Sequence, residues 1–204
     1  MAAHPDLPLR EEDLHEDPLV QFTRWYEEAR TASGYEAEAM GLATATPEGR
    51  PSLRMVLAKA IDERGIAFFT NYGSRKAREL EANPTAALLF HWVPLGRQVR
   101  IEGSLSRVSR EETAAYARRH ARASRLSALA SPQSRPVPSR EWLEQRVADL
   151  DRVHPDEVPV SDEWGGYRLA PDSWEFWQHR ANRLHDRFVY TPDGAGWRIE
   201  RLGP

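Results

Sequence analysis

The chain has 204 residues, of which 40% are hydrophobic, and a formal net charge of −3. This length fits one domain with a sizeable core, and the slight excess of acid argues against a dedicated nucleic-acid-binding protein. Cysteine is absent, which excludes disulfide frameworks and thiolate metal or redox sites, and no apolar stretch suits a leader or a membrane span. We expect a soluble cytoplasmic protein that binds neither membrane nor nucleic acid.

The N-terminal part begins with residues 1–16, which have no hydrophobic periodicity and few large apolar groups. We predict that they form a flexible arm, ordered only where it docks, and that residues 17–204 form a single domain. Asp17 followed by Pro18 is typical of a helix start, and apolar residues at helical spacing continue until Gly34 ends the helix.

Strand signals dominate the rest of the chain. Short apolar or alternating runs predict strands over residues 39–46, 51–61, 66–70, 86–93, 98–108, 164–170, 173–178, 184–190 and 197–202. Helical patterns cover residues 75–82, a short segment opened by a capping box at Ser109 and Glu112, and residues 143–150. Short antiparallel strands with helices between them, instead of alternating β-α-β units, favour an α+β protein built on a β-barrel.

Residues 122–139 form a segment rich in Ser, Arg and Pro. It is longer than a compact domain normally leaves without structure, so it is either functional or partly helical around residues 126–129. We favour a binding loop.

Four cations surround the predicted start of helix 75–82. Arg54 and Lys59 lie on the strand predicted over residues 51–61, and Arg75 and Lys76 open the helix. Free backbone N–H groups at a helix start favour an anion, and a core strand does not carry so many cations without partners. Each residue alone fits a solvated basic face, but the four together favour a phosphate site.

A second group of polar residues lies near the C-terminus. On a strand, Arg183, His185 and Arg187 share one face at a period of two. They fit either a solvent-facing strand edge or the recognition of an anion. Trp177 is either an ordinary core aromatic or a planar wall against a flat heterocycle.

Several common site patterns are absent from the sequence. Neither GxGxxG nor GxxxxGK[ST] occurs, so a Rossmann or P-loop nucleotide site has no support. The seven histidines show no metal-binding spacing, and GxSxG is missing, so neither a metal site nor a serine triad is predicted.

Seven segments, in their order and spacing, resemble the pyridoxamine 5′-phosphate oxidase family: RMVLAK, FFTNYGSRKA, LGRQV, SPQSRPV, WGGYRLAP, EFWQ and RLHDRFVY. The resemblance covers residue 17 to the end. It implies a split β-barrel that forms a homodimer with FMN at the subunit interface. It also implies oxidation of pyridoxamine or pyridoxine 5′-phosphate to pyridoxal 5′-phosphate, a vitamin B6 reaction in which O2 becomes H2O2.

The resemblance assigns roles to individual residues of this chain. It implies that FMN is bound by Arg54, Met55, Val56, Leu57, Lys59, Phe69, Thr70, Arg75, Lys76, Gln98, Gln133, Ser134, Trp177 and Arg187, some of them across the dimer. It implies that the substrate is bound by Lys59, Tyr116, His120, Ser124, Arg183, Leu184 and His185. Within this set, Lys59, Tyr116 and Ser124 surround the substrate phosphate. Arg183 and His185 form the catalytic pair over the pyridine ring.

Two short segments depart from the family pattern. His120 and Ala121 stand where the family usually has Arg-Pro, and residues 179–180, His-Arg, replace a glycine pair. A relative in phenazine biosynthesis oxidises a tricyclic substrate on the same flavin platform, and this remains an alternative. A non-catalytic FMN-, pyridoxal-phosphate- or haem-binding split barrel is another. The presence of Lys59 and Tyr116 favours the vitamin B6 substrate.

Overall fold

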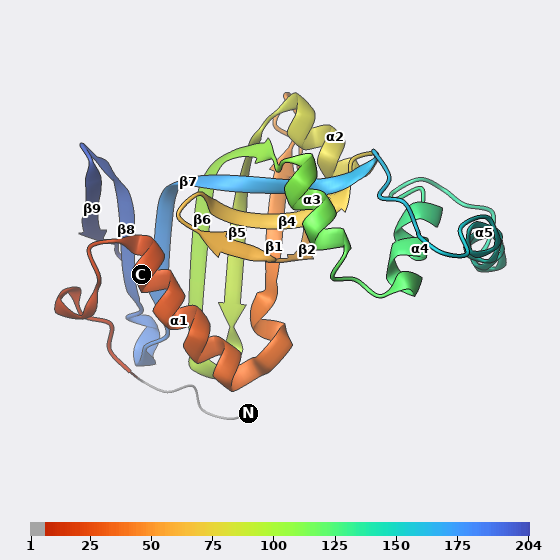
Figure 1. Ribbon diagram of the computed structural model, residues 1–204. Helices are drawn as coiled ribbons and strands as arrows, with labels where there is room; N and C mark the ends of the chain where they lie inside the picture. The colour runs from red at the N-terminus through yellow and green to blue at the C-terminus, as the bar shows by residue number, and fades with distance from the viewer. Residues whose placement is uncertain (1–6) are drawn as a thin grey trace.

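An antiparallel β-sheet forms the centre of the structure, a computed structural model that describes residues 7–204 (Figure 1). Its strands are β1 (Ala39–Ala45), β2 (Pro51–Leu57), β3 (Ala60–Asp62), β4 (Gly65–Asn71), β5 (Thr85–Trp92), β6 (Arg97–Arg107), β7 (Trp164–Gln178), β8 (Asp186–Asp193) and β9 (Gly196–Arg201). The strand order is β2-β1-β5-β6-β7-β4-β3, and β8 and β9 extend the sheet from β7. The prediction of an α+β protein with an antiparallel sheet is confirmed.

Five α-helices flank the sheet in the described range: α1 (Pro18–Ser33), α2 (Arg75–Ala82), α3 (Arg110–Ala117), α4 (Arg122–Ala130) and α5 (Arg140–Val153). As predicted, Asp17 caps α1 by accepting a hydrogen bond from a backbone N–H, and Gly34 ends the helix. Phe22 and Trp25 of α1 are buried in the core. None of these helices is long and apolar enough to span a bilayer.

The segment expected to be a binding loop is half helical. Residues 122–130 form α4, because Leu126 and Ala130 are buried at helical spacing. Helix α4 packs on α5, and Figure 1 shows this pair at the end of the molecule opposite β8 and β9. Residues 131–139 remain a loop. The helical alternative is therefore confirmed for the first half of the segment.

Strand β7 is 15 residues long and connects the two ends of the sheet. The first half of β7 pairs with β4, and the second half pairs with β8. Strand β6 pairs with β7 along most of the length of β7. A β-bulge at Asp172 inserts one unpaired residue. The insertion changes which alternate positions face inward, so Leu169 and Trp174 are buried in the same core. The two strands predicted over residues 164–170 and 173–178 are therefore one.

Two other strand predictions need correction. The strand predicted over residues 51–61 breaks after β2, because the N–H of Lys59 bonds to β4 and no longer to β1 (Lys59 N to Ala67 O, 2.8 Å). Strand β8 begins only at Asp186, because Arg183 has φ +64 and lies in a 3-10 turn. The expected alternation of Arg183 and His185 along one strand face is therefore wrong.

The described part of the predicted arm packs on β8. Leu9 is buried, its N–H donates to the carboxylate of Asp186 (3.1 Å), and the hydroxyl of Tyr190 donates to the carbonyl oxygen of His15 (2.9 Å). Residues 1–6 lie outside the described range. Residues 7–16 are thus docked beside the strand that carries Arg187.

Two turn glycines give a test of the fold. Gly65, the first residue of β4 after the turn from β3, has φ +115, and a Cβ there would lie 1.9 Å from the carbonyl oxygen of Leu169. Gly49, between β1 and β2, has φ +80 and open space around a Cβ. Gly65→Ala is expected to lower the free energy of unfolding by roughly 2–4 kcal/mol, since backbone strain and overlap add. Gly49→Ala should cost about 1 kcal/mol from strain alone. Urea unfolding measures both, and equal losses would contradict the expected overlap at Gly65.

Candidate functional site

A cation cluster, consisting of Arg54, Arg75 and Lys76, lies at the N-terminal end of α2. Arg54 reaches from β2 and donates a hydrogen bond to the carbonyl oxygen of Leu42 (3.1 Å). A single buried carboxylate, Glu79, pairs with Arg54 (3.3 Å) and with Arg75 (2.8 Å). Within the described part of the chain, three cations therefore face one carboxylate, and two positive charges are left without compensation.

Glu79 holds the two arginines of the cation cluster in place. Its Oε2 accepts hydrogen bonds of 2.5 Å from the hydroxyls of Thr44 and Ser52. Burial by itself would raise the pKa of Glu79, but these hydrogen bonds and the pairing with Arg75 outweigh it and lower the pKa to about 2. Glu79 is thus ionised at neutral pH, and it fixes both guanidinium groups.

Lys76 is the cation of the cluster that lacks a carboxylate. Its ammonium donates to the hydroxyl of Thr70 (3.0 Å) and to the side-chain oxygen of Gln133 (2.9 Å), and residues 7–204 provide no acidic partner for it. Burial, and secondly the charge of Arg54, lower the pKa of Lys76 to about 8. A partly buried ammonium next to another cation is stabilised by a bound anion. Ser134 is exposed beside Gln133 and has φ +67.

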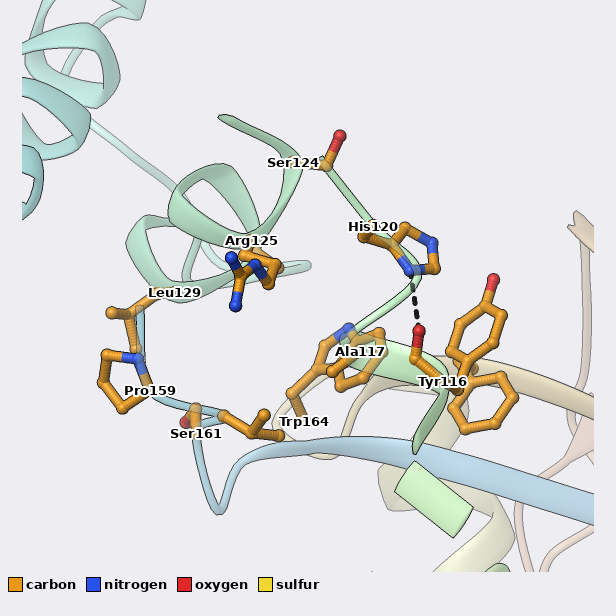
Figure 2. A pocket seen from close by; sticks show the side chains of 12 residues that line it. Tyr116, Ala117, His120, Ser124, Arg125, Leu129, Pro159, Ser161 and Trp164 are labelled. Carbon is orange, nitrogen blue, oxygen red and sulfur yellow. Dashed lines mark hydrogen bonds between the residues drawn. The ribbon is translucent and has the colours of Figure 1, made fainter. Parts of the chain in front are cut away.

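An aromatic cavity of about 240 Å³ lies between α3, α4 and the start of β7 (Figure 2). Phe69 precedes Thr70 on β4 and stacks on Tyr116 of α3 with ring centroids 3.7 Å apart. Trp164 continues the stack, nearly parallel to Tyr116 at 5.9 Å. Phe69 of the cavity and Thr70, which bonds to Lys76 of the cation cluster, are consecutive on β4, so the strand presents the cavity and the cluster on its two opposite faces.

The polar residues of the aromatic cavity come from α3 and α4. His120 and Ser124 line it, as does Arg125. The Nδ1 of His120 lies 3.1 Å from the carbonyl oxygen of Tyr116, to which it donates when it carries the proton (Figure 2). The structure thus brings together three of the predicted substrate residues: Tyr116, His120 and Ser124.

Lys59 lies on the other side of Tyr116, in a separate groove that Arg119 also lines. Its ammonium pairs with Glu38 (2.6 Å). Burial, and secondly the charge of Glu38, raise the pKa of Tyr116 to about 12, so its hydroxyl stays protonated at neutral pH. Tyr116 therefore borders both hollows, with His120 and Ser124 in one and Lys59 in the other.

The C-terminal candidates gather around His185. The ring of Trp177 lies 4.5 Å from the His185 ring, and His179 lies 5.3 Å from it on another side. The backbone N–H of Arg180 donates to the Nδ1 of His185 (3.1 Å), which leaves the ring proton on Nε2. Burial, His179 and Arg183 lower the pKa of His185. His185 therefore presents a neutral Nε2–H, while Arg183 and Leu184 beside it are exposed.

Three further predicted residues form a row across neighbouring strands: Gln98 of β6 pairs with Trp177 of β7, which pairs with Arg187 of β8. Directly paired residues in an antiparallel sheet project to the same face. Arg187 is held by Glu175 (2.8 Å), which also pairs with Arg100 (2.6 Å). The row thus presents an amide, an indole and a fixed guanidinium on one surface.

The predicted residues fall into two groups on a single chain. An N-terminal group combines the cation cluster and the aromatic cavity, and a C-terminal group combines Gln98, Trp177, His185 and Arg187. Strand β7 separates them, because Gly166 pairs with β4 and Trp177 pairs with β8. Eleven residues of strand span roughly 30 Å. One small ligand cannot touch both groups of the same chain.

The outer face of β2, β1 and β5 is apolar and exposed. Met55, Gly41 and Leu89 lie in one row, and Leu53 belongs to the next. The exposed fractions are 72% for Leu53, 66% for Met55 and 40% for Leu89. A contiguous exposed apolar patch marks a protein–protein surface. Of the other predicted residues of β2, half-buried Leu57 shares this face with Met55, and Val56 packs against the core on the opposite face.

Two residues of the site escaped the sequence analysis. Glu79 follows Arg75 by four positions on a predicted helix, a spacing that indicates an ion pair, but its contact with Arg54 depends on the fold. Arg125 lies in the segment expected to be a loop, so no periodicity pointed to it. Within the described range no cluster of His, Asp and Glu is arranged to hold a metal ion.

Family models match most of this chain. One described as "Pyridoxamine 5'-phosphate oxidase" matches residues 27–154, and one described as "Pyridoxine 5'-phosphate oxidase C-terminal dimerisation region" matches residues 164–204. A pyridoxine/pyridoxamine 5′-phosphate oxidase of Rubrobacter xylanophilus is 56% identical over 197 residues, which covers 96% of this chain and 91% of the relative. A protein of the same name from Cupriavidus taiwanensis is 52% identical over 197 residues, with 96% and 93% covered.

Solved structures show the same likeness. PhzG from Burkholderia lata 383, crystallised with tetrahydrophenazine-1-carboxylic acid, has a TM-score of 0.92 and 33% sequence identity, and the match covers 99% of this chain and 100% of PhzG. An FMN-binding protein related to pyridoxamine 5′-phosphate oxidase, from Nostoc punctiforme, shares the fold with a TM-score of 0.75 at 19% identity, covering 94% and 100%.

Proposed function

The chain belongs to the pyridoxamine 5′-phosphate oxidase family, which consists of FMN-dependent oxidoreductases, and on this premise we propose its reaction. The proposed reaction converts pyridoxamine or pyridoxine 5′-phosphate to pyridoxal 5′-phosphate. Two electrons pass to O2, which gives H2O2, and the amine substrate also takes up one water, whose oxygen becomes that of the aldehyde, and releases ammonia. The observation that carries the proposal is that β4 contributes Thr70 to a site for a phosphate dianion on one face and Phe69 to a flat aromatic cavity on the other.

The cation cluster fits the phosphate of FMN. Two uncompensated positive charges, the N-terminus of α2 and the hydroxyl of Thr70 match a phosphate dianion in charge and in donors. We propose that FMN is held here and by the other predicted cofactor residues: Met55, Val56, Leu57, Lys59, Phe69, Gln98, Gln133, Ser134, Trp177 and Arg187. When bound, FMN supplies the redox chemistry by accepting a hydride from the substrate and passing electrons to O2.

The substrate residues of the chain bind and orient. Tyr116, neutral at working pH, can donate its hydroxyl, and we propose that it acts with Lys59, His120 and Ser124 at the substrate phosphate. His185, with its proton on Nε2, donates one hydrogen bond to the pyridine ring or its substituents. Arg183 and Leu184, exposed beside it, complete the contact. These residues orient the reacting carbon and exclude water from it.

The finer architecture that we propose is a split barrel, with residues 17–204 as the FMN-binding domain and residues 1–16 as an appended arm. Strand β2 approaches β4 as well as β1, so the sheet curves back on itself. This curvature supports a barrel that is open on one side.

We also propose that the active unit is a homodimer with FMN at the interface. The apolar face around Leu53, Met55 and Leu89 supports a second copy. The separation of the two residue groups along β7 supports a site that takes one group from each chain. The match of residues 164–204 to a dimerisation region agrees with this arrangement.

The substrate is tested by peroxide release from the purified protein. We expect a yellow protein with about one FMN per chain, because the cation cluster binds a phosphate dianion tightly. Pyridoxine and pyridoxamine 5′-phosphate should each give one H2O2 per aldehyde formed, and pyridoxine without phosphate should react poorly. A yellow protein that oxidises a tetrahydrophenazine carboxylic acid but neither vitamin B6 phosphate would assign the chain to the alternative substrate.

A further inference from the structure

Arg125 of α4 is a cation of the aromatic cavity that has no partner. It lines the cavity, and Figure 2 shows its guanidinium on the cavity side of α4, toward Trp164. Its Nε is buried without a hydrogen bond, and no ion pair to Arg125 exists among residues 7–204. Burying part of a guanidinium without a partner is costly, so a ligand that supplies the missing acceptor is favoured.

Neighbouring arginines are occupied or lie elsewhere. Arg122, three residues earlier on the same helix, donates to the carboxylate of Asp151 on α5 (2.6 Å) and to the carbonyl oxygen of His154 (2.5 Å). Arg119 lines the groove on the Lys59 side of Tyr116. Arg125 is therefore the one permanent cation that lines this cavity in the described structure.

The other groups around the cavity do not neutralise Arg125. No carboxylate lines it, and its titratable neighbours are His120 and Tyr116. His120 already directs Nδ1 at the Tyr116 carbonyl, so it can offer only Nε2 to a ligand. A guanidinium, in contrast, grips a phosphate with two parallel N–H bonds.

We infer that Arg125 binds the phosphate of the substrate in the aromatic cavity, with His120 and Ser124 as weaker donors. The inference rests on the proposed function and deepens it. Phe69, Tyr116 and Trp164 supply a planar apolar wall, and Arg125 supplies the charge that this wall lacks. The ligand chemistry that fits is a small aromatic phosphate monoester.

The test compares Arg125→Gln with Arg118→Gln, which removes the same charge from an exposed position at the end of α3, outside this cavity. In Arg125→Gln, the KM for pyridoxine 5′-phosphate should rise roughly ten- to a hundredfold, as for the loss of charge-assisted hydrogen bonds, with kcat within about twofold. The KM for unphosphorylated pyridoxine should stay unchanged. Arg118→Gln should match the unmodified protein, and the FMN content of each variant shows that it is folded.

A direct titration makes the result independent of turnover. The inert probe is 4-deoxypyridoxine 5′-phosphate, followed by tryptophan fluorescence of the FMN-loaded protein, and Arg125→Gln should weaken its binding by the same factor. Adding His120→Arg to Arg125→Gln should restore most of the affinity, because a guanidinium returns to the same cavity. Unchanged KM and probe affinity in Arg125→Gln would overturn the inference while leaving the oxidase activity established. If the unmodified protein releases no peroxide, the proposed function is overturned instead. The probe titration would then still show whether Arg125 binds the phosphate.

Discussion

Two defective variants, Lys76→Met and Arg187→Leu, are expected to form a heterodimer that holds about one FMN per dimer, half the content of the unmodified protein. Each variant alone should lose FMN on dialysis, because each lacks one cation for the cofactor in both sites. In the mixed dimer, one site combines the intact N-terminal group of one chain with the intact C-terminal group of the other. Differently tagged chains, co-expressed and purified through both tags, allow FMN to be counted by absorbance.

The matched control places both substitutions on one chain and pairs it with an unmodified chain. Each site of that dimer then has one defective group, so FMN should be nearly absent. If each site were instead built from a single chain, the two results would be exchanged. The pair of dimers therefore distinguishes a shared site from two separate sites, using FMN content alone.

The affinity for FMN is expected to fall as the pH rises above about 8, because Lys76 of the FMN-free protein then loses its charge. The pKa of Lys76 is lowered to about 8 by burial and by Arg54. A phosphate dianion raises this pKa in the complex, so binding is strongest below about 8 and weakens by up to tenfold per pH unit above it. Glu79, with its pKa lowered to about 2, stays ionised and does not contribute in this range.

Variants at Lys76 separate its charge from other effects of pH. At pH 7, Lys76→Met should bind FMN roughly ten- to a hundredfold more weakly, as for the loss of a charge-assisted hydrogen bond, and its affinity should not change between pH 7 and 9.5. Lys76→Arg, which stays charged, should keep its affinity over the same range. Riboflavin, which has no phosphate, should respond neither to pH nor to the substitution. An unmodified protein with constant FMN affinity from pH 7 to 9.5 would contradict the role given to Lys76.

Local signals in the sequence predicted those elements whose boundaries are set by neighbouring residues. As expected, helix α1 begins with the cap Asp17 followed by Pro18 and ends at Gly34, and Ser109 caps α3. The sequence did not decide whether residues 122–130 form a helix. What stabilises α4 is the burial of Leu126 against other elements, and the local composition does not show that burial. The φ of +64 at Arg183 is likewise imposed by the tertiary structure, since a non-glycine residue gives no sign of it.

The candidate site was predictable where a residue type alone implies its chemistry. Lys76 and Thr70 are close in sequence to a helix start, so their meeting follows from local structure. The ion pair of Lys59 with Glu38 and the position of Arg125 in the cavity depend on contacts between distant segments. Residue type and spacing do not encode such contacts, and only the folded chain shows them.

The bulge at Asp172 limits where residues can be inserted into or deleted from the chain. Because one extra residue inverts the alternation along β7, deleting Asp172 would turn Trp177 inward and Phe176 outward, and would place an indole in the core where a phenyl ring now packs. A deletion in the loop of residues 131–139 has no such effect, because side chains there do not alternate between two faces. Between Trp164 and Gln178, a single codon therefore sets which face of the sheet each side chain occupies.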